Sequence, residues 1–381
     1  MGRGAAGAGE VGAPSRGAFL KKRYVPLGAG DDRRELAAKV AVELDVRGAA
    51  LGPAGDAGAN GAERRIGGEV AAVEEVPGED SQGPMMPRLT RHLLTGEELT
   101  SAELAALLER ALELKATRRS AEAPRPLAGR SIALLFERPS TRTRVSFEVG
   151  VGELGANPIV LRSDELQLSR GESPGDTARV LGRYVDALVV RSGDHQAVAE
   201  LAAADVVPVI NGLTPLHHPC QALADLVTLR ERFGGLDGLA LAYVGDGNNV
   251  ARSLCLLGRA AGVEVRVASP DRYRLEPGLA ALDTADPREA AAGADAVYTD
   301  VWVSMGDEAD AAERRAALAP YQLDAELLAA AADHAIALHC LPAHPGEEIT
   351  TDVLYGERSA VGDQAENRLH AQKALLELLV G

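Results

Sequence analysis

Cysteine is scarce in this 381-residue chain, which has only Cys220, Cys255 and Cys340. They lie far apart and form no CxxC pair, so the sequence predicts neither a disulfide framework nor a zinc site, as is typical of a reducing compartment. Long apolar runs are missing as well. No stretch reaches roughly 18 uninterrupted apolar residues, and the N-terminus lacks the apolar core of a signal peptide. We therefore expect a cytoplasmic protein without a membrane partner.

Basic residues are outnumbered by acidic ones. The chain has 40 Lys and Arg against 56 Asp and Glu, a formal net charge of −16, which disfavours nucleic acid and anionic lipid as partners. An anionic substrate would therefore need a local cluster of positive groups. The hydrophobic share of 46% and the charged share of 25% are those of a globular protein, and the length suffices for two domains.

The first 86 residues contain little that would fold. They carry 17 of the 41 glycines in stretches such as GAAGAGEVGAP, a composition that buries too little apolar surface to order a chain. Their 11 basic residues are outnumbered by 13 acidic ones, whereas a transit peptide is basic. Two interpretations stay open: a disordered extension, and a start assigned too early, with Met85 or Met86 as the first residue. We favour the second and expect these residues to be dispensable.

From Pro87 onward, short apolar segments alternate with amphipathic ones, the pattern of parallel βαβ construction. We predict two α/β domains with doubly wound parallel sheets at 87–219 and 220–362, and a C-terminal helix at 363–381 that packs back on the first domain. The predicted strands are 131–136, 158–161, 187–190, 207–210, 240–244, 264–268, 296–298 and 335–338. The predicted helices are 101–115, 142–154, 173–184, 219–233, 250–261 and 366–380.

The most informative segment, FERPSTRTR, begins at the end of an apolar strand and opens a predicted helix. Unpaired N–H groups and the positive end of the helix dipole form an anion site there. Ser140, Thr141 and Thr143 add hydroxyl donors, and Arg142 can bind two phosphate oxygens at once. The alternative is an ordinary helix cap followed by solvated arginines. Two arginines among three hydroxyls favour a phosphate site.

Three further polar segments follow predicted strands: GDGNN at 245–249, the stretch 300–306, and HCLP at 339–342. Ligands of open parallel sheets bind at the carboxyl ends of the strands, so we expect these segments to converge. Asp300 could bind an ammonium group, and Asn249 with the Ser304 and Met305 backbone could bind a carboxylate. The alternative for Asp300 is a helix cap. GDGNN is a poor dinucleotide site, because Val250 stands where that fingerprint needs glycine.

The STRTR segment resembles the carbamoyl-phosphate loop of the aspartate and ornithine carbamoyltransferase family. Residues 87–381 carry the family's motifs in order: ELQLSRGES, ARVLGRYVDALVVR, HPCQALADL, GDGNN, TDVWVSMG, HCLP and AENR. The resemblance implies transfer of the carbamoyl group of carbamoyl phosphate to the side-chain amine of L-ornithine, giving L-citrulline and phosphate. It implies no cofactor and no metal, because the activated phosphate is itself a substrate.

The resemblance also implies roles for individual residues. Negative charge builds on the carbamoyl oxygen during acyl transfer, and donors from Arg191, His218 and Thr143 would stabilise it. Gln221 would hold the carbamoyl nitrogen. The implied carbamoyl-phosphate site is Ser140, Thr141, Arg142, Thr143, Gln167, Arg191, His218, Gln221, Cys340, Leu341 and Arg368. The implied ornithine site is Asn249, Asp300, Ser304 and Met305, and the implied catalytic groups are Arg191, His218, Asp300, Cys340 and Arg368.

Several alternatives stay open. For Arg368 the alternative is a surface arginine, and for His218 a satisfied core histidine. The ornithine amine must lose a proton before it attacks, and either Cys340 or the departing phosphate could accept it. Two other amines stay open as the acceptor substrate. Aspartate would need a further cation in the site for its second carboxylate, and putrescine would need no carboxylate site. A binding protein that has lost activity is a rival from another class.

Two stretches raise separate expectations. In the family, the loop that matches Asp164–Leu168 enters the active site of a neighbouring subunit, so Gln167 implies a homotrimer or a multiple of trimers; the alternative is an exposed polar residue. The stretch 270–286 is shorter than the helix and strand usual in the family. We expect an outer helix to be lost there, with an effect on stability before chemistry. Pro345 stands where relatives often have a basic residue, a change far from the expected site.

Overall fold

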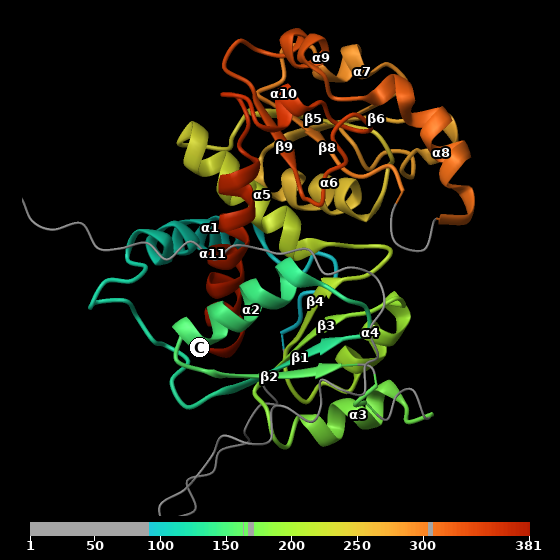
Figure 1. Cartoon of the computed structure of the whole chain (residues 1–381). Coiled ribbons are helices and arrows are strands. Elements are labelled where there is room, and N and C mark those ends of the chain that lie inside the picture. The colour runs from blue at the N-terminus through green and yellow to red at the C-terminus, as the bar shows by residue number, and fades with distance from the viewer. Residues whose placement is uncertain (1–90, 163, 167–170, 304–307) are drawn as a thin grey trace, which may run out of the picture. The chain divides into compact units, whose positions relative to one another are not determined.

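A computed structural model describes residues 91–162, 164–166, 171–303 and 308–381 of the chain (Figure 1). The predictions for residues 1–86, and those for Gln167, Ser304 and Met305, lie outside the described residues. In the part of the chain that the structure describes, no helix has the length and apolar character needed to cross a membrane.

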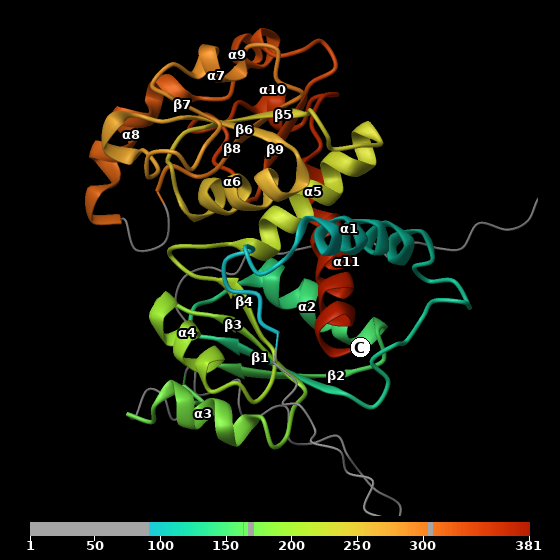
Figure 2. The same cartoon turned by 180° about the vertical axis from the view of Figure 1, so that it is seen from behind.

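The first sheet has four parallel strands in the order β2-β1-β3-β4. They are β1 (Ser131–Phe136), β2 (Asn157–Arg162), β3 (Ala187–Arg191) and β4 (Val209–Leu213), and the connecting helices are α2 (Thr141–Glu153), α3 (Pro174–Leu181) and α4 (His195–Ala203). Alternate β1 residues pack in two different cores: Ile132 and Leu134 face α2, while Ala133 and Leu135 face α3 and α4. Helices therefore cover both faces of the sheet, as predicted (Figures 1 and 2).

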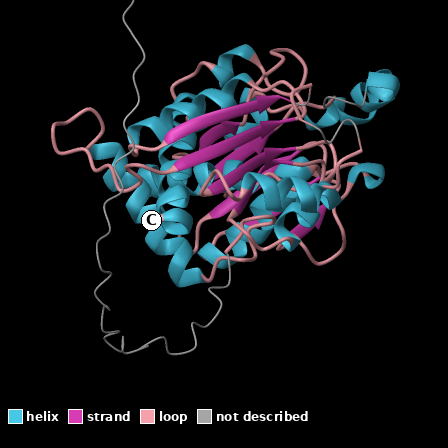
Figure 3. Ribbon diagram, turned by 90° about the horizontal axis from the view of Figure 1, so that it is seen from below, coloured by secondary structure: helices cyan, strands magenta, loops and turns pink. Residues whose placement is uncertain are grey.

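The second sheet has five parallel strands in the order β7-β6-β5-β8-β9. Figure 3, seen from below, shows strands that run side by side with helices around them. These strands are β5 (Ala240–Val244), β6 (Glu264–Ala268), β7 (Leu282–Thr284), β8 (Ala296–Thr299) and β9 (Ile336–His339). The helices of this domain are α6 (Asn249–Ala261), α7 (Pro287–Ala291), α8 (Ala311–Leu318), α9 (Ala325–Ala330) and α10 (Thr351–Leu354). The strands and helices predicted from sequence are present, with ends that shift by a few residues.

The sequence analysis missed α4, β7 and the short helices α7 to α10, which have too few residues to show a periodicity. The stretch 270–286 keeps its strand, β7, which pairs with β6. In place of an outer α-helix it has one turn of 3-10 helix at Asp271–Tyr273. The structure describes no α-helix within this stretch, and the sheet keeps its edge strand.

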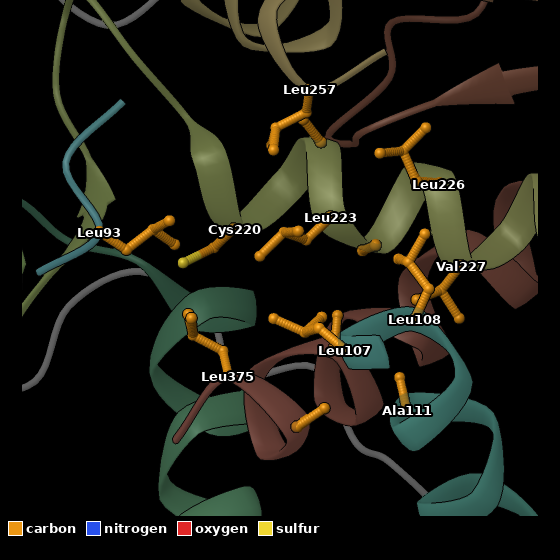
Figure 4. Packing of buried hydrophobic residues seen from close by; sticks show 14 of the residues in the cluster. Leu93, Leu107, Leu108, Ala111, Cys220, Leu223, Leu226, Val227, Leu257 and Leu375 are labelled. Carbon is orange, nitrogen blue, oxygen red and sulfur yellow. The ribbon is translucent and has the colours of Figure 1, made fainter. Parts of the chain in front are cut away.

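Two helices that are far apart in sequence join the two domains. They are α5 (Pro219–Phe233) and α11 (Val361–Val380), and α11 also packs on α1 (Ser101–Ala116) and α2. Figure 4 shows Leu107 and Leu108 of α1 beside Leu223 of α5 and Leu375 of α11, with Leu257 of α6 on the other side of α5. The C-terminal helix therefore packs on the first domain, as predicted, and its polar residues reach the carboxyl ends of both sheets.

Candidate active site

The helix that follows β1 begins as an open anion site. Its N-cap is Ser140, with φ −155° and ψ 111°, and the Ser140 side chain makes no capping hydrogen bond. Thr141 and Arg142 are exposed, whereas Thr143 is buried. The N–H groups of the first turn are thus not satisfied by a side-chain cap, and they remain available to an anionic ligand.

Arg191 is fixed at the end of β3 by the residue that follows β1. The backbone N–H of Glu137 donates to the Arg191 carbonyl oxygen at 3.0 Å. The Glu137 carboxylate accepts from the Ser192 hydroxyl at 2.5 Å and from the Gly193 N–H at 3.1 Å. Glu137 therefore ties the ends of the two central strands together, a role that the sequence did not reveal.

Four guanidinium groups gather at this edge of the first sheet. Burial, together with the charges of Arg368, Arg142 and Arg138, lowers the pKa of Arg191 to about 10. Arg191 still carries its charge at neutral pH. Cations held this close repel one another, and an anion bound among them would relieve that repulsion. In a chain with a net charge of −16, this is the kind of local positive site that an anionic substrate needs.

The last helix brings Arg368 to the first turn of α2. Arg368 is 4% exposed, so it is not the surface arginine that the sequence left open. Its Nη2 donates to the Thr143 hydroxyl at 2.7 Å, and its Nη1 donates to the side-chain oxygen of Gln221. Residues from α2, α5 and α11 thus meet in one buried cluster.

His218 is the N-cap residue of α5, and its backbone N–H donates to the Ser253 hydroxyl at 2.8 Å. Its ring is buried, and Nδ1 has no hydrogen-bond partner. Burial lowers the pKa of His218 well below its ordinary value, and the charges of Arg368 and Arg191 act in the same direction. The imidazole is therefore neutral and offers one N–H donor, which suits the stabilisation of an oxyanion.

Asp300 and Cys340 meet at the carboxyl ends of β8 and β9. The Cys340 thiol donates to Asp300 Oδ1 at 2.8 Å, and the Val301 N–H donates to the same oxygen at 2.8 Å. Asn248 Nδ2 donates to Oδ2 at 2.8 Å. These contacts hold the carboxylate in place, and Asp300 caps no helix in the described part of the chain.

The Cys340 thiol is held in its protonated form. Burial raises its pKa well above the ordinary value, and the charge of Asp300 raises it further. Only a thiolate acts as a nucleophile or accepts a proton at sulfur. In this arrangement Cys340 is a hydrogen-bond donor, and it supplies neither a base nor a covalent nucleophile.

His339 and Leu341 shape the turn around Cys340. The His339 ring has two polar contacts: Nε2 contacts Glu348 Oε1 at 3.1 Å, and Nδ1 accepts from the Leu341 N–H at 2.8 Å. Leu341 has φ +60°, a left-handed conformation that is strained for a leucine. Strained residues cluster at ligand sites, which agrees with the role predicted for Leu341.

Asn249 and Asn248 of the GDGNN segment take different positions. Asn249 Nδ2 donates to the Thr214 carbonyl at 2.7 Å. Asn248 caps α6 through Oδ1, which accepts from the Val250 N–H at 2.9 Å, and its Nδ2 holds Asp300. The sequence analysis gave a role to Asn249 and none to Asn248. The predicted helix begins at Val250, one residue later than α6, and this shift hid Asn248 as the cap residue.

Two groups of side chains have ligand atoms close enough to hold a metal ion, within 4.8 Å of one another. They are Asp300, His339 and Cys340, and His344, Glu347 and Glu348. In the first group the Leu341 N–H donates to His339 Nδ1 and Nε2 contacts Glu348, so both ring nitrogens already have partners. The contacts of this first group therefore fit polar positioning better than metal binding.

Comparison with known proteins matches both halves of the described chain. The family model described as aspartate/ornithine carbamoyltransferase, carbamoyl-P binding domain, matches residues 91–231, and the Asp/Orn binding domain model matches residues 237–379. The chain is 55% identical to an ornithine carbamoyltransferase of Acidothermus cellulolyticus, over 77% of this chain and 97% of the relative. It is 56% identical to one of Parafrankia sp., over 76% and 96%.

Solved structures agree with these matches. The ornithine carbamoyltransferase of Pyrococcus furiosus superposes with a TM-score of 0.74 at 46% identity, over 77% of this chain and 97% of that one. The enzyme of Thermus thermophilus gives a TM-score of 0.71 at 44% identity, over 77% and 100%. The similarity therefore extends over both sheets and both joining helices.

Proposed function

Because the chain belongs to the aspartate/ornithine carbamoyltransferase family, we infer that it transfers the carbamoyl group of carbamoyl phosphate to the side-chain amine of L-ornithine, giving L-citrulline and phosphate. The observation that carries this inference is the cluster of four arginines at the first turn of α2, a site for a small dianion. The Asp300 and Cys340 pair supplies a second, acidic half-site for an amine.

Each half of carbamoyl phosphate has suitable partners. The N–H groups at the start of α2, the hydroxyls of Ser140 and Thr141, and the Arg142 guanidinium would hold the phosphate. The carbamoyl oxygen would receive hydrogen bonds from Thr143, Arg191 and His218, with Arg368 in the same region. The carbamoyl amine would donate to Gln221, and the strained turn at Leu341 would contact the same group through its carbonyl oxygen.

The reaction needs no group beyond these residues. The lone pair of the ornithine amine attacks the carbamoyl carbon, and the electrons of the C=O bond move onto the oxygen to give a tetrahedral intermediate. When the C=O bond re-forms, the bond to the phosphate oxygen breaks and phosphate leaves with the electron pair. The amine must also lose a proton. Since the Cys340 thiol is already protonated, the departing phosphate is the better acceptor.

Asp300 favours ornithine over the alternative amines. A buried carboxylate attracts the cationic side chain of ornithine and repels the second carboxylate of aspartate. Putrescine has no α-carboxylate and would leave Asn249 and the backbone at Ser304 and Met305 without a ligand. Formation of the carbamoylated product from carbamoyl phosphate with ornithine, aspartate and putrescine, measured side by side, tests this assignment. Of the three amines, we expect only ornithine to be carbamoylated. Carbamoylaspartate as the main product would overturn the assignment.

The reaction belongs to arginine metabolism, in its biosynthetic or its catabolic direction. We propose a cytoplasmic location, because Cys220, Cys255 and Cys340 are all free thiols. Residues 1–86 are proposed to be dispensable for the reaction, since both family matches begin after them.

We propose further that the enzyme is a homotrimer, or a multiple of trimers, in which Gln167 of one chain completes the site of the next. Two features of α2 support a neighbour there. Val145 and Val149 are 51% and 38% exposed on the surface next to Arg142. A hollow of about 330 Å³ at the same place is lined by Thr141 and Arg142 together with Arg118 of the loop after α1. A segment of a second chain could fill this hollow and reach the phosphate site.

Shared sites predict complementation between two inactive variants. Arg142→Ala and Gln167→Ala each damage a different half of the site. If the halves belong to different chains, a mixed trimer contains interfaces where intact Arg142 meets intact Gln167. Unfolding and refolding the two variants together should then give about a quarter of wild-type activity, because each half is intact in half of the chains.

The control for complementation is wild-type protein taken through the same refolding, which must recover most of its activity. Each variant refolded alone gives the background. Activity of the mixture equal to the sum of the two backgrounds would place the whole site within one chain and leave Gln167 without a catalytic role.

A further inference from the structure

Asp225 is a buried carboxylate close to the active site, and the sequence assigned it no function. It lies one turn after Gln221 on α5 and is 0% exposed. Its Oδ1 accepts two side-chain N–H groups, from Gln221 Nε2 at 2.8 Å and from Gln364 Nε2 at 2.7 Å. The two hydrogen bonds favour the ionised carboxylate, but burial is the larger effect and raises the pKa of Asp225 to about 7.

A carboxylate is an unfavourable choice at this place for stability alone. Burying its charge opposes folding, and asparagine of nearly the same shape would avoid that charge. An ionised carboxylate differs from an asparagine in one respect that matters here, since it can only accept hydrogen bonds. Asp225 can therefore fix which way a neighbouring amide points.

The orientation of the Gln221 amide follows from its two partners. Asp225 accepts from the nitrogen end of this amide, and Arg368, which can only donate, binds its oxygen end. The Gln221 oxygen thus lies on the side of Arg368 and Thr143. A carbamoyl amine has two N–H donors and needs an acceptor. If the Gln221 amide were reversed, the carbamoyl amine would face the Gln221 NH₂ group, which is also a donor.

Asp225 is itself held by the C-terminal helix. Gln364 of α11 donates to it and accepts from the backbone N–H of His339 at 2.9 Å. A continuous buried chain of hydrogen bonds therefore joins the end of β9 to the first turn of α2. Its members, none more than 4% exposed, are His339, Gln364, Asp225, Gln221, Arg368 and Thr143.

We propose that Asp225 is a positioning residue for carbamoyl transfer: it holds the Gln221 amide with its oxygen turned toward the carbamoyl amine of the substrate. The proposal rests on the function inferred above, because it requires a ligand with a carbamoyl group. Asp225 touches neither substrate, and its effect passes entirely through Gln221.

Two stable ligands of the same shape isolate this effect. Phosphonoacetamide carries an amide –NH₂ where acetonylphosphonate carries a methyl group, and both have the same phosphonate and carbonyl. Gln221 can accept a hydrogen bond from the first ligand and not from the second. The ratio of their dissociation constants, measured by calorimetry at about pH 8.5 where Asp225 is ionised, therefore reports the orientation of Gln221. The full chain is used throughout.

In Asp225→Leu the Gln221 amide loses the partner of its nitrogen, and only the contact with Arg368 still favours its orientation. We expect the preference for phosphonoacetamide to fall roughly 3- to 10-fold, the range for one hydrogen bond, while acetonylphosphonate binds as before. Asp225→Asn, which keeps the shape and can donate as well as accept, should lose about threefold and should unfold at no lower temperature. If Asp225→Leu does not fold, the ligand preference of Asp225→Asn by itself tests the proposal.

Thr228→Val is the matched control, one turn further along the same helix. Thr228 is also buried and accepts from Asn367 of α11 at 3.0 Å, but it makes no contact with Gln221. This variant should keep the wild-type preference. Two results would overturn the proposal: an unchanged preference in both Asp225 variants, or an equal loss of affinity for both ligands, which would indicate a structural role.

The wild-type protein separates this proposal from the function on which it rests. If wild type binds both ligands equally, the assignment of Gln221 to the carbamoyl amine fails, whatever the variants do. If wild type prefers phosphonoacetamide and forms citrulline while the Asp225 variants keep the preference, only the role of Asp225 is wrong.

Discussion

Asp300→Asn is expected to lower kcat/KM for ornithine by about 30-fold or more. The change removes a buried negative charge and keeps the shape of the side chain. Removing one partner of a buried, hydrogen-bonded charge pair costs about 2 to 5 kcal/mol, which corresponds to this range. The loss should fall on ornithine, because Asp300 lies with Cys340 and Asn248 at the second sheet, whereas the phosphate-binding arginines gather at the edge of the first sheet. Initial rates of citrulline formation at varied ornithine measure the effect.

Binding of phosphonoacetamide serves as the internal control for this variant, and we expect it to change less than threefold. Asp295→Asn is the matched control in the same domain. Asp295 accepts from the Ala240 N–H at 2.8 Å and contacts His334, both at the opposite end of the sheet from Asp300. It should leave ornithine kinetics unchanged. A parallel loss of affinity for both substrates in Asp300→Asn would instead identify Asp300 as a structural residue.

Arg142→Ala is expected to lower kcat/KM for carbamoyl phosphate by about 100- to 1000-fold. Arg142 can bind two phosphate oxygens at once, and deleting a charge-assisted donor that acts on the transition state costs roughly 3 kcal/mol. Arg142→Lys should recover part of the loss, because it restores the charge and not the two-point geometry. The measurement is the initial rate at varied carbamoyl phosphate with ornithine near saturation.

Arg144 is the control that the same motif provides. It lies two residues further along α2, is exposed, and pairs with Glu148 at 3.3 Å. An exposed pair of this spacing contributes only about 0.3 to 0.5 kcal/mol, so Arg144→Ala should change the kinetics less than threefold. Equal effects of the two substitutions would mean that the charge of the helix start matters and that Arg142 makes no specific contact.

Most of the framework could be predicted from the sequence, because the determining interactions are local. Strands such as Ser131–Phe136 and Ala240–Val244 are short and almost wholly apolar, and this pattern is enough to mark a buried parallel strand. The anion site at the start of α2 follows from the order of residues alone, since a strand, hydroxyls and an arginine occupy consecutive positions. Asp300 and Cys340 could be placed near each other because the carboxyl ends of parallel strands share one edge.

Tertiary structure decided the roles that depend on distant partners. Whether Arg368 is a surface residue or a buried donor to Thr143 depends on how α11 packs, and those two residues are 225 positions apart. The protonation of Cys340 and the neutral state of His218 come from burial and from charges brought by other elements, which no local pattern encodes. Asp225 looks like any polar residue of a helix in the sequence. Only folding places Asp225 between the side chains of Gln221 and Gln364 and excludes water from its carboxylate. Without water as an alternative partner, each hydrogen bond must join a donor to an acceptor, so the orientation of the Gln221 amide matters.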